Sequence, residues 1–469
     1  MVAQAVPTRL PRPTRIQASG LVIGFIAFLV PLVVDVPDLD PAGERMLAIF
    51  LLAIVLWLTE AIPLVATALL VLLLEVLLLT DQALVPLADE VLVASDVFAT
   101  LADPVIVLFL GGFLIADGAA KYDLDRNLAA VLLRPFAAGG ARRTALGLML
   151  ITALLSMFVS NTATTATMFA VVLPVLAGLP AGRARTGLAL AIPIAANVGG
   201  MGTPVGSPPN AIALGQLSAA GGSVSFLDWM LLAVPLMLAL LFGAWFFVTR
   251  RFIPADTTLD LEMTARFNRS PAAIVFTVVA GVTVVLWLTE PIHGLSSSTV
   301  GFLPVVALLA TGVLGPRDLQ GLQWHVLWLV AGGIALGAGI SGSGLDTWIL
   351  GAVAWDRMAA ATLLGLLALA ALALSNVISN SAAANLLVPL ALSLATTVAV
   401  EPALMAVLVG LACALGMALP ISTPPNAIAY ATGEVPQPAM ASTGIVIGVV
   451  GGAALAFAMP PLWTWLGLL

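Results

Sequence analysis

Residues 186–218 read TGLALAIPIAANVGGMGTPVGSPPNAIALGQLS, an uncharged stretch long enough to cross a lipid bilayer. Two consecutive prolines, Pro208 and Pro209, interrupt it, because proline lacks a backbone donor and clashes with the preceding helical turn. A helix that restarts at these prolines directs its N-terminal amides, and the positive end of its dipole, into the membrane interior. The stretch therefore predicts a broken membrane-spanning helix.

The same motif recurs in the second half of the chain, together with three others in the same order. The pairs are LWLTE at 56–60 and 286–290, Gly-Gly at 111–112 and 332–333, Ser-Asn-Thr at 160–162 with Ser-Asn-Ser at 379–381, and SPPNAIA at 207–213 with TPPNAIA at 423–429. One such match is weak evidence, but an ordered set of matches indicates an internal repeat.

Composition predicts a membrane protein. Of the 469 residues, 61% are apolar and 9% are charged, whereas soluble domains carry about 25% charged residues. We expect an all-α polytopic fold with about eleven transmembrane helices. The absence of a basic patch excludes nucleic acid as a partner, and the lone Cys413 excludes a disulfide framework. The expected spans lie near 19–35, 44–60, 62–80, 102–119, 186–218, 227–249, 273–291, 297–315, 324–342, 402–432 and 443–467.

The basic residues predict the orientation, because cytoplasmic loops retain Lys and Arg. With a cytoplasmic N-terminus, only Arg45 and Arg357 of the 17 basic residues lie outside. The C-terminus is then external, and the membrane is of the bacterial inner (plasma) type. Each half contains an odd number of crossings, so the two halves have inverted topology, which is typical of secondary transporters.

Two apolar stretches, 144–182 and 358–400, remain outside these spans. Arginines flank the first on both sides, so both of its ends are expected in the cytoplasm and the segment must enter and return. Such a re-entrant hairpin exposes non-helical backbone at its tip, which is tolerated only inside protein or beside a water-filled cavity. The two tips carry residues 160–162 and 379–381. Alternatively, each stretch forms two short full crossings.

These elements divide the chain into four parts. Residues 1–43 form a cytoplasmic N-terminus and first helix, and residues 251–272 form a cytoplasmic linker. Residues 44–250 form a first repeat of scaffold helices, the hairpin 144–182 and the broken helix 186–218. Residues 273–469 form a second repeat of scaffold helices, the hairpin 358–400 and the broken helix 402–432.

The polar motifs lie in windows without titratable side chains. Residues 144–182, 186–227, 358–400 and 402–433 contain no Asp, Glu, Lys, Arg or His. Proton relays in membranes normally need such side chains, so proton coupling is not expected. The hydroxyls, amides and backbone dipoles that remain suit a hard monovalent cation and a hydrogen-bonded carboxylate. A neutral site of this kind binds a dianion when bound cations balance the charge.

The paired Ser-Asn tips, the paired Pro-Pro-Asn breaks and the LWLTE segments resemble the divalent anion/sodium symporter family, from about residue 44 to the C-terminus. The resemblance implies sodium-coupled import of small C4 dicarboxylates of the succinate, malate and fumarate class. It also implies a homodimer in which a transport domain moves against a scaffold domain like an elevator. Sodium is then the co-transported ion, and neither a prosthetic group nor an enzymatic activity is implied.

The resemblance further implies the binding residues. Asn161 and Thr162 contact one substrate carboxylate, Asn380 and Ser381 contact the other, and Ser207, Thr423 and Pro424 line the same site. The implied ligands of the two sodium ions are Ser156, Ser160, Asn161 and Gly206 for the first, and Ser375, Ser379, Asn380 and Ser422 for the second. Ser381 departs from the family pattern, which has threonine here, so substrate size is less well predicted than transport.

Other functions are consistent with parts of this pattern. A passive anion channel would use the same dipoles, and an intramembrane hydrolase would need catalytic groups that neither His293 nor His325 supplies within a polar motif. A sodium-independent dicarboxylate exchanger, or a symporter for sulfate or citrate, also fits the motifs. Glu75 is an intramembrane carboxylate and hence a candidate functional residue, although no motif accompanies it. Glu60 and Glu290 are interpreted as structural anchors.

Overall fold

The computed structural model describes residues 14–87, 91–137, 140–257, 266–351, 355 and 358–468. These ranges are helical, with no strand among them beyond an isolated bridge between Thr80 and Leu92. The first half contains α1 (Arg15–Val33), α2 (Pro41–Thr59), α3 (Leu64–Leu79), α4 (Ala94–Ala99), α5 (Pro104–Lys121), α6 (Leu124–Ala137), α7 (Gly140–Ser156), α8 (Asn161–Ala177), α9 (Arg183–Gly199), α10 (Pro208–Ala219) and α11 (Phe226–Phe252).

The second half follows a similar order of helices. It contains α12 (Pro271–Leu288), α13 (Glu290–His293), α14 (Ser297–Ala310), α15 (Pro316–Gln320), α16 (Trp324–Gly342), α17 (Leu345–Gly351), α18 (Ala360–Val377), α19 (Asn380–Thr397), α20 (Pro402–Ala414), α21 (Pro424–Ala431), α22 (Gln437–Ala453) and α23 (Met459–Trp465). A π-helical turn joins α22 to α23. The chain is therefore an all-helical, multi-pass membrane protein, as its composition predicts.

Eight helices of the described chain are long and apolar enough to cross a membrane. The expected number was about eleven, and breaks in the helices account for part of the difference. The expected span 186–218 divides into α9 and α10, and the expected span 402–432 divides into α20 and α21. Both breaks precede a Pro-Pro pair, whose first proline starts the next helix at the position where its missing N–H is tolerated. The count of eleven crossings stays a prediction.

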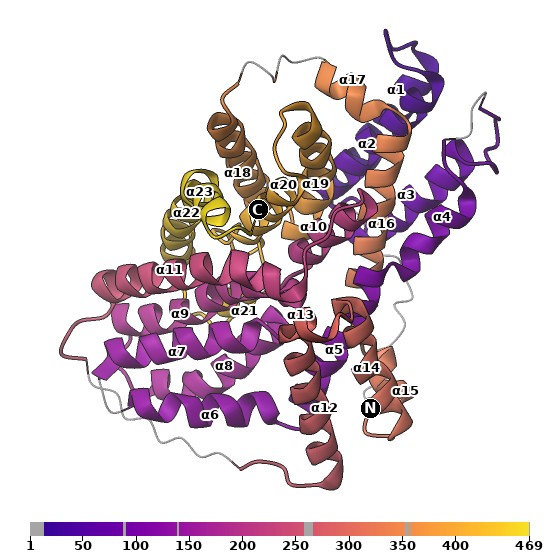
Figure 1. Cartoon of the computed structure of the whole chain (residues 1–469). Helices are drawn as coiled ribbons and strands as arrows, with labels where there is room; N and C mark the ends of the chain where they lie inside the picture. The colour runs from indigo at the N-terminus through magenta and orange to yellow at the C-terminus, as the bar shows by residue number, and fades with distance from the viewer. Residues whose placement is uncertain are drawn as a thin grey trace.

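Helices α3, α5, α14 and α16 pack together in a group that we call the wall. Helix α3 packs along α16, α5 along α14, and α12 along α14, while α1 packs on α2 at the edge of the molecule (Figure 1). Glycine makes the two central contacts possible. A Cβ at Gly111 would lie 1.9 Å from the carbonyl oxygen of Gly301, and one at Gly332 would lie 2.6 Å from Ala68 Cβ. The repeated Gly-Gly pair therefore marks close helix packing in both halves.

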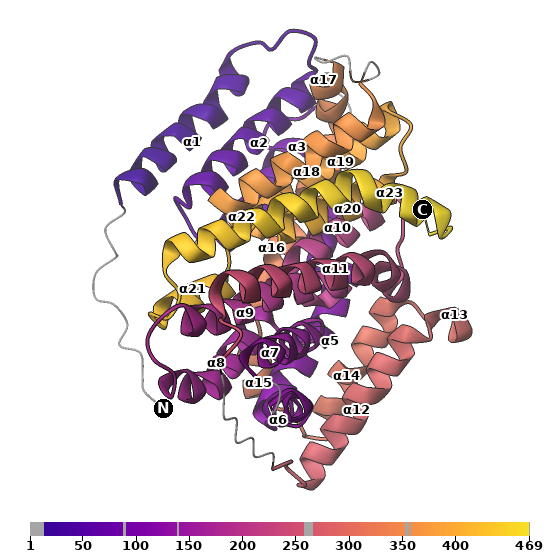
Figure 2. The same ribbon diagram turned by 90° about the vertical axis from the view of Figure 1, so that its left-hand side faces the viewer.

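A second group of helices contains the polar motifs. The stretch 144–182 forms α7 and α8, and the stretch 358–400 forms α18 and α19, in each case with the Ser-Asn tip at the break. The halves interlock here, because α10 packs on α19 and α20 while α21 packs on α8 and α9 (Figure 2). Whether the two hairpins re-enter the membrane stays a prediction.

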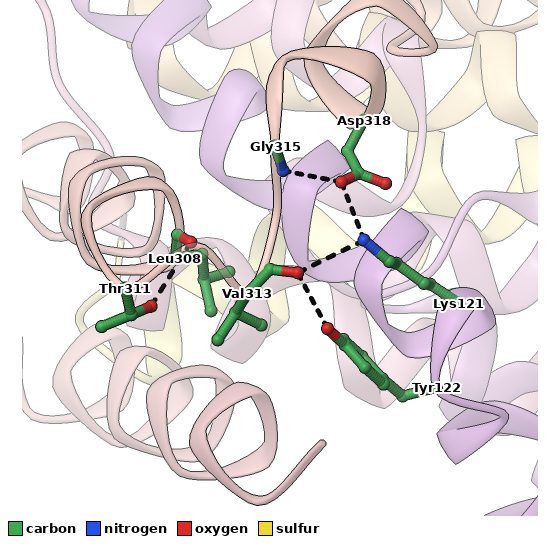
Figure 3. A network of polar contacts seen from close by, with 7 residues as sticks. All are labelled: Lys121, Tyr122, Leu308, Thr311, Val313, Gly315 and Asp318. Atoms are coloured by element: carbon green, nitrogen blue, oxygen red, sulfur yellow. Dashed lines mark hydrogen bonds and ion pairs between the residues drawn. The ribbon is translucent and has the colours of Figure 1, made fainter. Parts of the chain in front are cut away.

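The C-terminal end of α5 is tied to the segment between α14 and α15 (Figure 3). Lys121 Nζ donates to Asp318 Oδ2 at 2.8 Å and to the Val313 carbonyl at 3.3 Å, and Tyr122 Oη donates to the same carbonyl at 2.8 Å. The Gly315 amide also donates to Asp318 at 2.7 Å. Burial raises the pKa of Asp318, but the hydrogen bonds and the charge of Lys121 outweigh it and leave that pKa below its ordinary value.

Candidate functional site

Four helix N-termini meet at one cavity of about 520 Å³. They belong to α8, α10, α19 and α21, which begin at Asn161, Pro208, Asn380 and Pro424. The cavity is lined by Leu64, Phe113, Ser160, Asn161, Thr162, Asn197, Val205, Gly206, Ser207, Pro208, Pro209, Gln323, His325, Val326, Leu329, Ser379, Asn380, Ser381, Ala414, Ser422, Thr423, Pro424 and Pro425. The positive dipole ends of these helices favour negative charge in the cavity.

The cavity brings together the residues that the family resemblance implies for binding. All seven expected substrate-binding residues line it: Asn161, Thr162, Ser207, Asn380, Ser381, Thr423 and Pro424. Of the further residues expected to hold sodium, Ser160, Gly206, Ser379 and Ser422 also line it. Ser156 and Ser375 do not line the cavity but lie behind it, one on α7 and one on α18. The lining residues include no Asp, Glu, Lys or Arg.

Behind the first tip, two acceptor oxygens face the single proton of the Ser156 hydroxyl. The Ser156 hydroxyl lies at hydrogen-bonding distance from the side-chain oxygen of Asn161, and 2.8 Å from the Ala196 carbonyl oxygen. A hydroxyl carries a single proton, so it donates to only one of these acceptors at a time. The second acceptor oxygen then faces the serine Oγ with no proton between the two atoms.

The second tip has the same arrangement. The Ser375 hydroxyl lies 2.7 Å from the side-chain oxygen of Asn380 and 2.6 Å from the Cys413 carbonyl oxygen. Both serines are fully buried. We call the two groups the oxygen triads: Ser156, Asn161 and Ala196 in the first half, and Ser375, Asn380 and Cys413 in the second. Hard oxygen ligands of this kind suit a cation such as Na⁺.

The asparagine of each Pro-Pro-Asn motif closes the break in its helix. Asn210 donates from Nδ2 to the carbonyls of Gly200 and Thr203, at 2.9 and 2.8 Å. Asn426 donates likewise to the carbonyls of Met417 and Leu419, at 2.7 and 3.0 Å. Buried backbone carbonyls need such partners wherever a helix is interrupted inside a membrane protein. Sequence analysis quoted these motifs but assigned their asparagines no role.

A further amide contact joins the two broken helices to each other. Asn197 on α9 donates from Nδ2 to Asn426 Oδ1 on α21 at 3.0 Å, and both side chains are buried. At the end of the same pair of helices, Arg185 forms an ion pair with Glu434. The cavity is thus built from elements of both halves, held together by polar contacts.

Comparison with known proteins identifies the family. Residues 54–410 match the family model described as CitMHS, citrate transporter. The chain belongs to the citrate transporter family. A sodium-dependent dicarboxylate transporter, SdcS, of Staphylococcus saprophyticus is 30% identical over 95% of this chain and 92% of its own length. An uncharacterized transporter of Haemophilus influenzae is 31% identical over 93% of this chain and 95% of its own length.

A solved structure supports the fold. The crystal structure of the Alcanivorax borkumensis YdaH transporter matches with a TM-score of 0.57, at 18% identity, over 86% of this chain and 98% of that one. At this identity the likeness concerns the fold alone. The family and the curated relatives are transporters, which removes the hydrolase alternative.

The transporter's cavity also contains residues that sequence analysis did not assign to it. Gln323 and His325 enter it from the start of α16, and Phe113 enters it from α5. His325 lies at the start of the expected span 324–342 and belongs to none of the polar motifs. No polar motif surrounds His325 or Phe113, and their position depends on how the wall packs, so the sequence carried no signal for them.

Several conspicuous residues of the transporter lie outside the cavity. Both carboxylate oxygens of Glu75 are buried without a hydrogen-bond partner, and they face α16, where a Cβ at Gly339 would lie 2.7 Å from Glu75 Oε1. Glu290 accepts a hydrogen bond from Ser297 Oγ at 2.6 Å, and His293 contacts the Leu286 carbonyl at 2.9 Å. These contacts fit structural roles for Glu290 and His293, and Glu75 belongs to the wall.

Proposed function

We propose that this transporter is a sodium-coupled symporter that imports small C4 dicarboxylates of the succinate class. The observation that carries the proposal is the pair of oxygen triads, which lie directly behind a cavity lined by four helix N-termini and by no charged side chain. The names of the Staphylococcus relatives as sodium-dependent dicarboxylate transporters support it.

The dicarboxylate binds between the two tips. Asn161 and Thr162 hydrogen-bond one carboxylate while Asn380 and Ser381 hydrogen-bond the other, and Ser207, Thr423 and Pro424 line the space between. Amide and hydroxyl donors give the orientation, and the helix dipoles give part of the charge balance. Two carboxylates at a site lined by neither Lys nor Arg need further positive charge, which two sodium ions supply.

One sodium ion binds at each tip. The first is held among Ser156, Ser160, Asn161 and Gly206, and the second among Ser375, Ser379, Asn380 and Ser422. In each triad the ion binds beside the serine hydroxyl and asparagine side-chain oxygens, which lie within hydrogen-bonding distance of each other. Because Asn161 and Asn380 contact both ion and substrate, an occupied sodium site orients the amide for the carboxylate, and this shared ligand couples the two.

Transport proceeds by an elevator-type movement within a homodimer, in which the hairpins and broken helices slide past the wall formed by α3, α5, α14 and α16. The two halves are inverted repeats, the N-terminus is cytoplasmic and the C-terminus is external. The matched packing of α3 on α16 and of α5 on α14 supports a two-fold relation between the halves, since exchanging the halves converts one contact into the other.

The test is uptake of radiolabelled succinate by the purified protein in liposomes. We expect accumulation against a gradient when sodium is outside, with a Hill coefficient for sodium above one. Ser156→Ala and Ser375→Ala should each raise the sodium concentration for half-maximal uptake, whereas Ser442→Ala, whose hydroxyl bonds only the Ala439 carbonyl of its own helix, should not. Unchanged uptake in sodium-free choline buffer would contradict symport and identify a sodium-independent exchanger or a channel.

A further inference from the structure

Two aspartates occupy matching places in the two halves of the chain. Leu124-Asp125 follows Gly111-Gly112 at the same spacing at which Leu345-Asp346 follows Gly332-Gly333. The backbone matches as well, because Asp123 and Gly344, which precede these pairs, both have positive φ, of 54° and 71°. Left-handed residues end helices, so each one turns the chain from a wall helix, α5 or α16, into the helix that follows it, α6 or α17.

Each aspartate makes the same two contacts. One carboxylate oxygen accepts the amide of the next residue at 2.7 Å, from Arg126 in the first half and from Thr347 in the second. The other oxygen accepts a hydroxyl from the second arm of the neighbouring hairpin. These hydroxyl bonds are Thr167 Oγ1 to Asp125 Oδ2 at 2.9 Å, on α8, and Ser393 Oγ to Asp346 Oδ2 at 3.0 Å, on α19.

The two bonds link the wall to the cavity site. Helices α5 and α16 supply Phe113 and His325 to the cavity, while α8 and α19 begin with the tip residues Asn161 and Asn380. Helices α6 and α17 lie at opposite ends of the molecule in both views (Figures 1 and 2). One bond therefore holds a hairpin at each end of the structure.

We propose that Asp125 and Asp346 are a matched pair of positioning residues, each of which sets the place of a Ser-Asn tip relative to the wall through its hydroxyl bond to the hairpin arm. Neither aspartate touches the cavity of the tips. A hydrogen bond to an ionised carboxylate is stronger than one between neutral groups, so it is suited to holding an arm in one register.

The two bonds differ in where they attach and in what surrounds them. Thr167 lies about two turns from the start of α8, whereas Ser393 lies almost four turns from the start of α19. Asp125 is 4% exposed. Asp346 and Ser393 instead line a separate cavity of about 320 Å³, together with Gln216 and Ser341. The second bond thus holds its tip from farther away and beside open space, so we expect its loss to change binding less than loss of the first.

The inference rests on the proposed coupling of sodium and dicarboxylate at the tips, and the experiment separates the two. Wild-type uptake in sodium and in choline tests the coupling alone. Thr167→Val and Ser393→Ala, compared with wild type, test the positioning. Each should raise the KM for succinate and the half-saturating sodium concentration, by roughly 5-fold or more for Thr167→Val. If wild-type uptake proves independent of sodium, the succinate KM of the variants alone tests the positioning proposal.

Conservative variants separate positioning from general stability. Thr167→Ser and Ser393→Thr keep the hydroxyl and should restore values within about twofold of wild type. Thr277→Val and Ser442→Ala remove hydroxyls that bond only their own helices, at Ala273 and Ala439, and serve as matched controls.

Melting temperatures of the purified variants are measured beside uptake. Should a hydroxyl variant fail to fold, Asp125→Asn and Asp346→Asn, which keep the side-chain volume, give the same comparison. A folded protein that lacks either hydroxyl yet keeps the wild-type KM and half-saturating sodium concentration would overturn the proposal.

Discussion

At the scale of single residues, the site is built from side chains that serve two purposes. Asn161 and Asn380 begin a helix, line the cavity and contact the serine of an oxygen triad. Ser381 lines the cavity, and within the described chain its hydroxyl has no hydrogen-bond partner. The sequence located these motifs because polar residues are conspicuous in uncharged apolar stretches, whereas the binding roles were implied by the family resemblance and stay predictions.

Ser381 provides a test of which side chains face the substrate. Ser381→Thr keeps the hydroxyl and adds one methyl, so we expect the order of preference among succinate, malate and bulkier dicarboxylates to change, by about 1–3 kcal/mol per methylene-sized group. Sodium dependence should stay intact. Ser381→Ala should weaken all dicarboxylates together. Competition of unlabelled acids against radiolabelled succinate measures both, and identical profiles in the three proteins would remove Ser381 from the substrate site.

At the scale of elements, the sequence predicted the broken helices and the helical pairs but not the hydrogen bonds that span the breaks. Proline and glycine signals located the breaks, since their effect on helices is local. The bonds that close each break are local, from Asn210 and Asn426 to carbonyls 7 to 10 residues earlier. The bond between Asn197 and Asn426 instead joins residues that tertiary packing brings together. The helices α6 and α17 were also missed, because α6 contains charged residues and α17 has only 7 residues.

The Pro-Pro-Asn asparagines are expected to matter for stability. Asn426→Ala leaves the Met417 and Leu419 carbonyls without their donor, and a buried polar group left unsatisfied typically costs about 1–3 kcal/mol. Asn210→Ala should act similarly through Gly200 and Thr203. Thermal unfolding in detergent measures the loss. Asn268→Ala, at an exposed amide that bonds only the Ser270 backbone, is the comparison. Melting temperatures equal to wild type for both motif variants would contradict this role.

The joint between α5 and the α14–α15 segment should respond to pH. Because the pKa of Asp318 is lowered in the folded protein, its contribution to stability is present above the pKa of the unfolded chain, near 4, and is lost as the pH falls through the lower folded value. Lys121 and Asp318 are partly exposed, so solvent limits the contribution to about 1 kcal/mol or less. Asp318→Asn should make the free energy of unfolding depend less on pH in this range. A pH dependence identical to wild type between pH 3 and 5 would contradict this prediction.

At the scale of the whole molecule, orientation is the feature that the fold leaves to experiment. Arg143 and Arg183 flank the first hairpin. In a Cys413→Ala background, cysteines at these two positions should both react with an impermeant thiol reagent only from the cytoplasmic side. A tag at the C-terminus should be reachable only from outside. Labelling of the two positions from opposite faces would mean that α7 and α8 are full crossings.

Matching positions in the two halves also differ in burial. During elevator movement the buried position would become exposed and the exposed position would become buried. Val205 is 8% exposed and packs on α5, where a Cβ at Gly112 would lie 3.0 Å from Val205 Cβ. Its counterpart before the second break, Ile421, is 76% exposed. Sodium and substrate should change the labelling rates of Val205→Cys and Ile421→Cys in opposite directions. Rates that rise or fall together would speak against an exchange of environments between the halves.

The interlocking of the halves has a consequence for how the protein is made. Helix α10 packs on α19 and α20, and α8 packs on α21, so partners of the first half emerge from the ribosome some two hundred residues later. At about 5–20 residues per second, that delay is roughly 10–40 s. During this interval the tip with Asn161 is in the membrane without the helices that later enclose it. The nascent first half therefore depends on the translocation machinery or on surrounding water to shelter its polar groups until the second half arrives.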